Sequence, residues 1–186
     1  MVKLSQRDNR WGYQTIGWSS LLIRDYGCTI TCLSMILGTT PDVFNRKMRD
    51  IGGFSGALII WSKVAQAFPG ITVYRYFGYN NDAVRDATPN VLVEVPAYPI
   101  GGLGRHWVVY VGNQRLYDPW TGLERPTSDF PNPTGYSIVR GIVTPPPLPP
   151  YTERQALVDI KGIAYGTQDD STTRQRVKEV LAKIGV

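Results

Sequence analysis

Two cysteines and a single histidine are the side chains of this 186-residue sequence best suited to nucleophilic catalysis. Cys28 follows Gly27 at the predicted start of a helix, where the N–H groups of the first turn lower the pKa of a thiol. His106 opens a predicted strand in GRHWVVYVG, and Asp118 follows in LYDPW. The three residue types suit catalysis by a thiol nucleophile (Cys28), its base (His106) and a carboxylate that orients the base (Asp118). A buried structural thiol, an incidental histidine and an Asp-Pro turn are the structural alternatives.

The segment between His106 and Asp118 reads as a hairpin whose loop length decides whether the two side chains meet. If the loop is 112–114, three residues long, Val111 pairs with Arg115. His106 and Asp118 then share a face as diagonal neighbours, with Cα atoms roughly 7 Å apart. A two-residue loop would instead put the two side chains on opposite faces of the sheet.

Cys32 stands one helical turn after Cys28 and fits a buried packing role. Two cysteines in adjacent turns of one helix have poor disulfide geometry, so both are predicted to be thiols. Two Cys and one His do not make a structural zinc site, and neither a metal nor a cofactor is predicted. Acyl transfer also needs oxyanion donors. The N–H of Cys28 is one candidate; the side chain of Gln6, Asn9 or Gln14 is another, and spacing does not choose among these three.

The pattern along the chain predicts helices first and strands afterwards, which is an α+β fold. Apolar residues at helical spacing predict a helix over 28–37, stopped by Gly38. Trp11, Trp18 and Trp107 flank the motifs; they are predicted to pack in the core, and a contact with substrate is the alternative. Further helices are predicted over 41–51, 58–67 and 81–87, and strands over 71–77, 91–95, 106–111, 115–117 and 137–143.

A proline-rich stretch divides the chain. Residues 1–143 are predicted to form one catalytic domain, and 144–150 (TPPPLPP) an extended linker. Residues 151–186 then form a helical C-terminal tail with an apolar stripe. The tail either docks onto a protein or cell-wall partner or packs against the domain.

The composition is that of a globular protein with a net charge of +5 and a pI of about 9.3. The basic residues are scattered, so no nucleic-acid partner is predicted. No apolar stretch reaches the length of a membrane span, and the N-terminus has no signal-like apolar region. No membrane association is predicted.

Four segments, in order, carry a family resemblance: LSQRDNRWG, YGCTITCLSMIL, GRHWVVYVG and LYDPWTG. Together they resemble the C39-like family of papain-like cysteine peptidases, in its stand-alone branch from bacteria and bacteriophages. The likeness spans about residues 4–143 and implies a papain-like fold, with N-terminal helices packed on an antiparallel sheet. It implies Cys28 as nucleophile, His106 as base, Asp118 as the residue that orients the base, and Gln6 as oxyanion donor.

The expected function is therefore hydrolysis of a peptide or isopeptide bond through a Cys28 thioester. The expected substrate is a peptide, a protein or peptidoglycan. Transfer to an amine would use the same thioester. The rival function is a non-catalytic binding or structural module on the same scaffold, such as a virion component. The expected location is the cytoplasm, or the virion if a phage encodes the chain.

Overall fold

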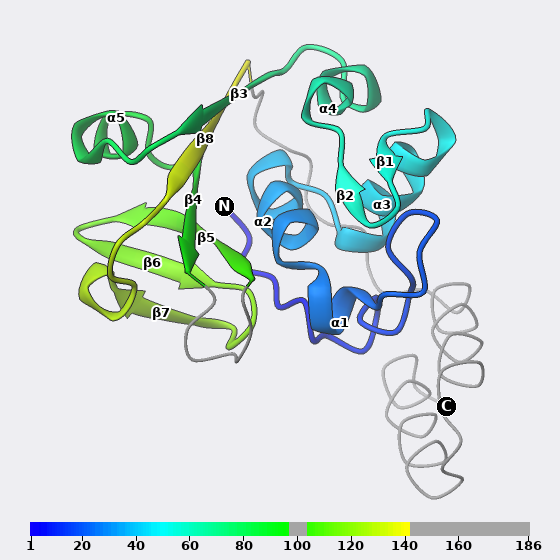
Figure 1. Cartoon of the computed structure of the whole chain (residues 1–186), viewed down its shortest axis with the longest axis horizontal. Helices are drawn as coiled ribbons and strands as arrows, with labels where there is room; N and C mark the ends of the chain where they lie inside the picture. Colours follow the sequence, from blue (N-terminus) through cyan, green and yellow to red (C-terminus); the bar gives the residue numbers. More distant parts are fainter. Residues whose placement is uncertain (97–103, 142–186) are drawn as a thin grey trace, which may run out of the picture.

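The computed structural model describes residues 1–96 and 104–141, which form helices packed against an antiparallel sheet (Figure 1). The helices are α1 (Ile23–Tyr26), α2 (Cys28–Leu37), α3 (Pro41–Asp50), α4 (Trp61–Ala67), α5 (Asn81–Asp86) and the 3-10 turn η1 (Thr127–Asp129). The strands are β1 (Phe54–Ser55), β2 (Leu58–Ile59), β3 (Thr72–Phe77), β4 (Val91–Pro96), β5 (Arg105–Gly112), β6 (Arg115–Asp118), β7 (Leu123–Pro126) and β8 (Gly135–Arg140). The predicted α+β class is confirmed.

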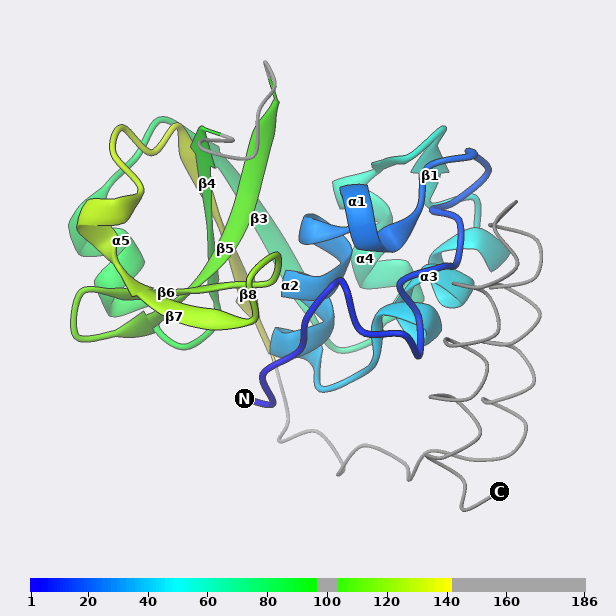
Figure 2. The ribbon, with the colours of Figure 1, turned by 90° about the horizontal axis from the view of Figure 1, so that it is seen from below.

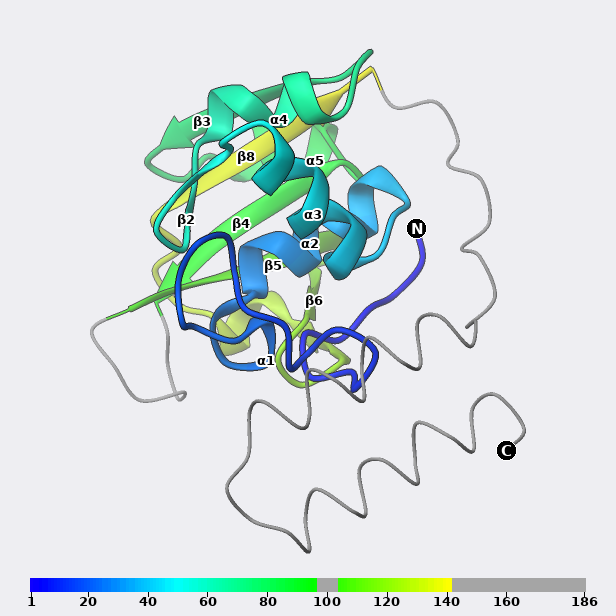
Figure 3. The same ribbon diagram turned by 90° about the vertical axis from the view of Figure 1, so that its right-hand side faces the viewer.

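Helix α2 is the central helix and has the bounds that the sequence predicts. Its side chains Ile30, Leu33 and Ile36 are buried, because apolar residues at this spacing share one face of a helix. The helix ends at Gly38, which adopts the left-handed conformation with φ of 63° that favours glycine at this position. Figure 3 shows α2 lying across the sheet, and it packs on β5 and β4.

The main sheet has six strands in the order β3-β8-β4-β5-β6-β7, and every neighbouring pair is antiparallel. Helices α1 to α4 cover one face and α5 covers the other (Figure 2). Leu92 and Val109 face the first group of helices, whereas Val93 and Val108 pack with Val84 of α5. The central strands are therefore buried on both faces, which explains their nearly continuous apolar sequences.

The hairpin between β5 and β6 combines a two-residue turn with a bulge. Asn113 and Gln114 have φ of 50° and 55°, as a type I′ turn requires, and Gly112 pairs with Arg115. The predicted pairing of Val111 with Arg115 is therefore wrong. Val111 is instead an extra, bulged residue, and beyond it the strands pair as predicted, with Val109 opposite Tyr117. The bulge compensates for the shorter turn, so His106 and Asp118 stay on one face.

Other element boundaries differ from the predictions. The helix predicted over 58–67 starts only at Trp61, because Leu58–Ile59 turns back at Gly56 (φ 61°) and pairs with Phe54–Ser55. Strand β8 begins two residues earlier than predicted and ends at Arg140. Neither α1, β7 nor η1 was predicted. The predicted proline linker (144–150) and the predicted helical tail (151–186) lie outside the described residues. Within 1–96 and 104–141, no helix has the length and apolar character to cross a membrane.

Candidate active site

Cys28 is the first residue of α2, as predicted, and its side chain is half-buried. The chain turns sharply from α1 into α2, and the N–H of Gly27 donates to the carbonyl of Ile23 at 2.7 Å. A Cβ at Gly27 would lie 2.5 Å from that carbonyl oxygen, so only glycine fits this approach. The close packing of the two helices places the thiol at the N-terminal end of α2, where the N–H groups of the first turn favour an anion.

His106 and Asp118 form a hydrogen-bonded pair beside this thiol. The Nε2 of His106 lies 2.7 Å from Oδ1 of Asp118, and the two side chains are only 6% and 2% exposed. Asp118 is itself held in place, because Oδ1 accepts from the N–H of Trp120 at 2.9 Å and Oδ2 from the hydroxyl of Thr121 at 3.1 Å. Asp118 therefore shapes its Asp-Pro turn and also orients His106.

The ring nitrogens of His106 have different partners. Since Nε2 bonds to Asp118, the second nitrogen, Nδ1, is left for the hydrogen bond that His106 makes with Cys28. A carboxylate on one nitrogen and a thiol on the other is the arrangement in which imidazole can take the thiol proton and stay aligned.

Burial and charge act in opposite directions on this pair. Burial alone would raise the pKa of the Cys28 thiol, but the hydrogen bond and charge of His106 bring that pKa below its ordinary value. Burial alone would lower the pKa of His106, but its hydrogen bonds to Asp118 and Cys28 and their negative charges raise that pKa to about 9. Burial would likewise raise the pKa of Asp118, and the contacts with His106 lower it. Together these shifts favour the thiolate–imidazolium form of the pair over the neutral form.

The backbone of Trp107 also contacts the thiol, which sequence reasoning missed. Strand β6 ends at Asp118, so the N–H and C=O of Trp107 have no partner strand on that side and face α2 instead. The N–H hydrogen-bonds to the sulfur of Cys28 and helps to lower its pKa. The carbonyl accepts a hydrogen bond from Sγ of Cys32 at 3.3 Å. No residue type signals this contact, because it depends only on where β6 stops.

Cys32 is completely buried, in agreement with its predicted packing role. Burial, followed by the negative charges of Cys28 and Asp118, raises the pKa of Cys32 well above its ordinary value. Both cysteines are free thiols. Of the two, only Cys28 is accessible and stabilised as a thiolate.

Gln6 lies next to the site, but its amide N–H groups are directed elsewhere. Its Nε2 donates to the backbone carbonyls of Arg24, at 3.0 Å, and Ile23, at 3.4 Å, both in α1. Its backbone N–H donates to the carbonyl of Pro119, so Gln6 ties the N-terminal segment to α1 and to the turn after Asp118. The side chain is 1% exposed. An oxyanion donor must present an N–H to the substrate, and this geometry does not support that role for Gln6.

The three predicted core tryptophans divide into two groups. Trp11 and Trp107 are buried as predicted, and the ring of Trp107 contacts Trp61 with ring centroids 5.2 Å apart. Trp18 is 66% exposed, so its predicted core position is wrong; its ring lies 4.5 Å from the guanidinium of Arg49. Arg49 covers one face of Trp18 in place of a core contact.

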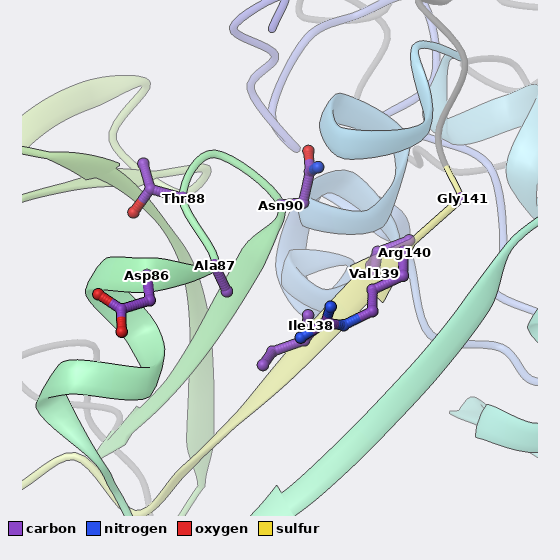
Figure 4. Close-up of a pocket in the computed structure, with 8 residues that line it drawn as sticks. All are labelled: Asp86, Ala87, Thr88, Asn90, Ile138, Val139, Arg140 and Gly141. Atoms are coloured by element: carbon purple, nitrogen blue, oxygen red, sulfur yellow. The ribbon is translucent and has the colours of Figure 1, made fainter.

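A pocket of about 380 Å³ lies at the other end of β4 (Figure 4). It is lined by Asp86, Ala87, Thr88, Asn90, Ile138, Val139, Arg140 and Gly141. His106 pairs with Val95, whereas Asn90 precedes the first residue of the same strand. The five residue steps from Asn90 to Val95 correspond to roughly 16 Å. The pocket is therefore separate from the catalytic candidates. Within the described ranges, no three His, Cys, Asp or Glu side chains are grouped so as to hold a metal ion.

Comparison of the sequence with models of known protein families and with curated proteins gives no match. The likeness to the C39-like peptidases therefore depends on the motifs themselves.

Proposed function

We propose that this protein is a papain-like cysteine hydrolase that cleaves a peptide or isopeptide bond. The observation that carries the proposal is the juxtaposition of a helix N-terminal thiol with a buried histidine whose far nitrogen lies 2.7 Å from a carboxylate. The pKa of Cys28 is lowered and that of His106 is raised, so each side chain stabilises the charged form of the other.

In the proposed mechanism, the Cys28 thiolate attacks the carbonyl carbon of the scissile bond. The imidazolium of His106 then gives its proton to the leaving amine, which leaves an acyl thioester on Cys28. His106, now neutral, takes a proton from water as that water attacks the thioester. Asp118 keeps the ring aligned and stabilises its positive charge at each stage. An amine that replaced water would give transfer by the same route.

The arrangement of the elements supports a papain-like scaffold and membership of the C39-like family. The thiol begins the central helix of one layer, and the base and its carboxylate follow, in that order, on neighbouring strands of the sheet. Residues 1–70, which include α1 to α4, hold eight Lys and Arg against four Asp and Glu, whereas 71–141 hold six of each. The layer that carries Cys28 is therefore basic, which favours a substrate held in anionic surroundings, such as the peptide part of a bacterial cell wall.

One observation favours the rival function, a binding or structural module such as a virion component. The amide of Gln6 donates to α1 and is not exposed, so the side-chain oxyanion donor that the resemblance implies is absent from the geometry. A site with a reactive thiol and incomplete oxyanion stabilisation would bind a carbonyl group without rapid turnover.

The test is alkylation of the native protein by iodoacetamide across pH, with Cys28→Ala, His106→Ala and Cys32→Ala as variants. Rapid labelling of Cys28 well below the ordinary thiol pKa of about 8.5, slowed in His106→Ala, is expected. Cys32→Ala should leave the pH profile unchanged. Labelling with an ordinary thiol profile that His106→Ala does not alter would refute the catalytic proposal and favour the binding module.

A further inference from the structure

The proposed reaction needs a donor for the oxyanion, and the residue that the resemblance implies does not provide one. Both hydrogen bonds from Nε2 of Gln6 end on carbonyls of α1, and the side chain is almost completely buried. The carbonyl of Ile23 also accepts from the N–H of Gly27, but releasing the amide would take away the donor that Gln6 gives the carbonyl of Arg24, which costs about 1–3 kcal/mol for a buried group. The donor has to be sought among groups that already lie at the sulfur.

Two such groups belong to the first turn of α2. The backbone N–H of Cys28 lies at the start of the helix, where N–H groups have no acceptor within the helix. The hydroxyl of Thr29 lies 3.9 Å from Sγ of Cys28, and the Thr29 side chain is half-buried, so a substrate can reach it. The N–H of Trp107 also meets the sulfur, but it belongs to a buried strand residue. The Thr29 hydroxyl contacts the sulfur as well, and it differs in being accessible to a substrate.

We infer that the hydroxyl of Thr29, together with the backbone N–H of Cys28, stabilises the oxyanion during acyl transfer. This rests on the proposed function of the same site. A donor acts at about 2.7–3.1 Å from the oxyanion, and the oxyanion forms two bonds from Sγ, so a donor about 4 Å from the sulfur is suitably placed. Thr29 Oγ1 meets this condition, and a threonine hydroxyl rotates freely to direct its hydrogen.

The step balances without any other reagent. Sγ of Cys28 forms a bond to the carbonyl carbon, and the carbonyl π electrons move onto oxygen. Thr29 donates a hydrogen bond to that oxygen and keeps its proton. The electron pair then reforms the carbonyl as the bond to the leaving group breaks, which gives the thioester.

Two reagents that attack the same sulfur separate this role from thiol activation. Acetylation of Cys28 by p-nitrophenyl acetate passes through an oxyanion and releases p-nitrophenolate, whereas alkylation by iodoacetamide displaces iodide and forms no oxyanion. Both rates are measured on the full chain, as the wild type and as Thr29→Val and Thr29→Ser. Thr31→Val is the matched control, because Thr31 lies in the same helix and its buried hydroxyl has no hydrogen-bond partner among the described residues.

Because the Thr29 hydroxyl also contacts the sulfur, both rates are compared on the high-pH plateau, where Cys28 is fully ionised in every variant. There Thr29→Val should slow acetylation about 100-fold, as loss of one oxyanion donor does, with alkylation changed by less than about threefold. Thr29→Ser and Thr31→Val should retain both rates. Equal slowing of both reactions in Thr29→Val, or no slowing of either, would overturn the inference. Selective loss of acetylation in Gln6→Met, with none in Thr29→Val, would assign the donor to Gln6 and overturn it as well. A wild-type thiol that reacts with both reagents like an ordinary cysteine would instead reject the proposed function.

Discussion

Replacing Asp118 by Asn should lower the pKa of His106 by one to two units. The shift of the His106 pKa from 6.5 to about 9 corresponds to about 3 kcal/mol in favour of the imidazolium, at 1.36 kcal/mol per unit. The hydrogen bond to Asp118 is 2.7 Å long, buried and charge-assisted, and such a bond contributes about 1.5–3 kcal/mol. Its loss therefore moves the His106 pKa to about 7–8, while the amide of Asn still accepts from Nε2 and keeps the ring in place.

The assay is a pH titration of the imidazole signals by NMR, which is unambiguous because the chain has one histidine. Cys28→Ala should also lower the pKa of His106, since the thiolate contributes to raising it. Asp129→Asn is the control: this carboxylate pairs with Arg125 at 3.0 Å on the surface and should leave the titration of His106 unchanged. A wild-type His106 that titrates near 6.5, with no response to Asp118→Asn, would refute the reasoning.

Three further substitutions test the packing around the site. Cys32→Ala should cost about 1–2 kcal/mol in urea unfolding, because it removes a buried thiol that donates to the carbonyl of Trp107, while Cys28 remains alkylatable. Gly27→Ala should slow alkylation of Cys28 at neutral pH, because its Cβ would collide with the backbone of α1 and displace the start of α2. Gly135→Ala should lower the unfolding free energy by about 1–3 kcal/mol, because its Cβ would come 2.7 Å from the backbone carbonyl of Tyr76, which cannot move aside as the nearby guanidinium of Arg75 can; an unchanged urea midpoint would contradict this.

The residues that meet at the site could be predicted because each one has a local signature. A thiol after a glycine at a helix start, a histidine at a strand start and an Asp-Pro turn are readable in the sequence. The face of the sheet on which His106 and Asp118 lie depends on the β5–β6 hairpin, where Asn113 and Gln114 both adopt positive φ and Val111 is bulged. Such a bulge gives no clear pattern of residue types, so the sequence left two face assignments open.

The donors around the sulfur could not be predicted in the same way. The N–H of Trp107 reaches Cys28 because β6 ends at Asp118, and strand ends are set by tertiary contacts. The burial of Gln6 depends on carbonyls of α1, a four-residue helix that has no amphipathic pattern to detect. Long elements such as α2 were predicted to the residue, since a periodic apolar face and a terminal glycine define both ends.

Because Val111 is bulged, the number of residues in the hairpin between His106 and Asp118 does not by itself decide whether the two side chains lie on the same face of the sheet. Removing that one residue would leave a regular ladder with Tyr110 still opposite Leu116, and the imidazole and the carboxylate would remain on one side of the sheet. A homologous hairpin one residue shorter is therefore compatible with the same pair. Natural selection on such a site would keep His106 and Asp118 on the same face of the sheet and would tolerate insertions and deletions in the loop between β5 and β6. The number of residues between His106 and Asp118 is therefore a poor criterion for recognising relatives.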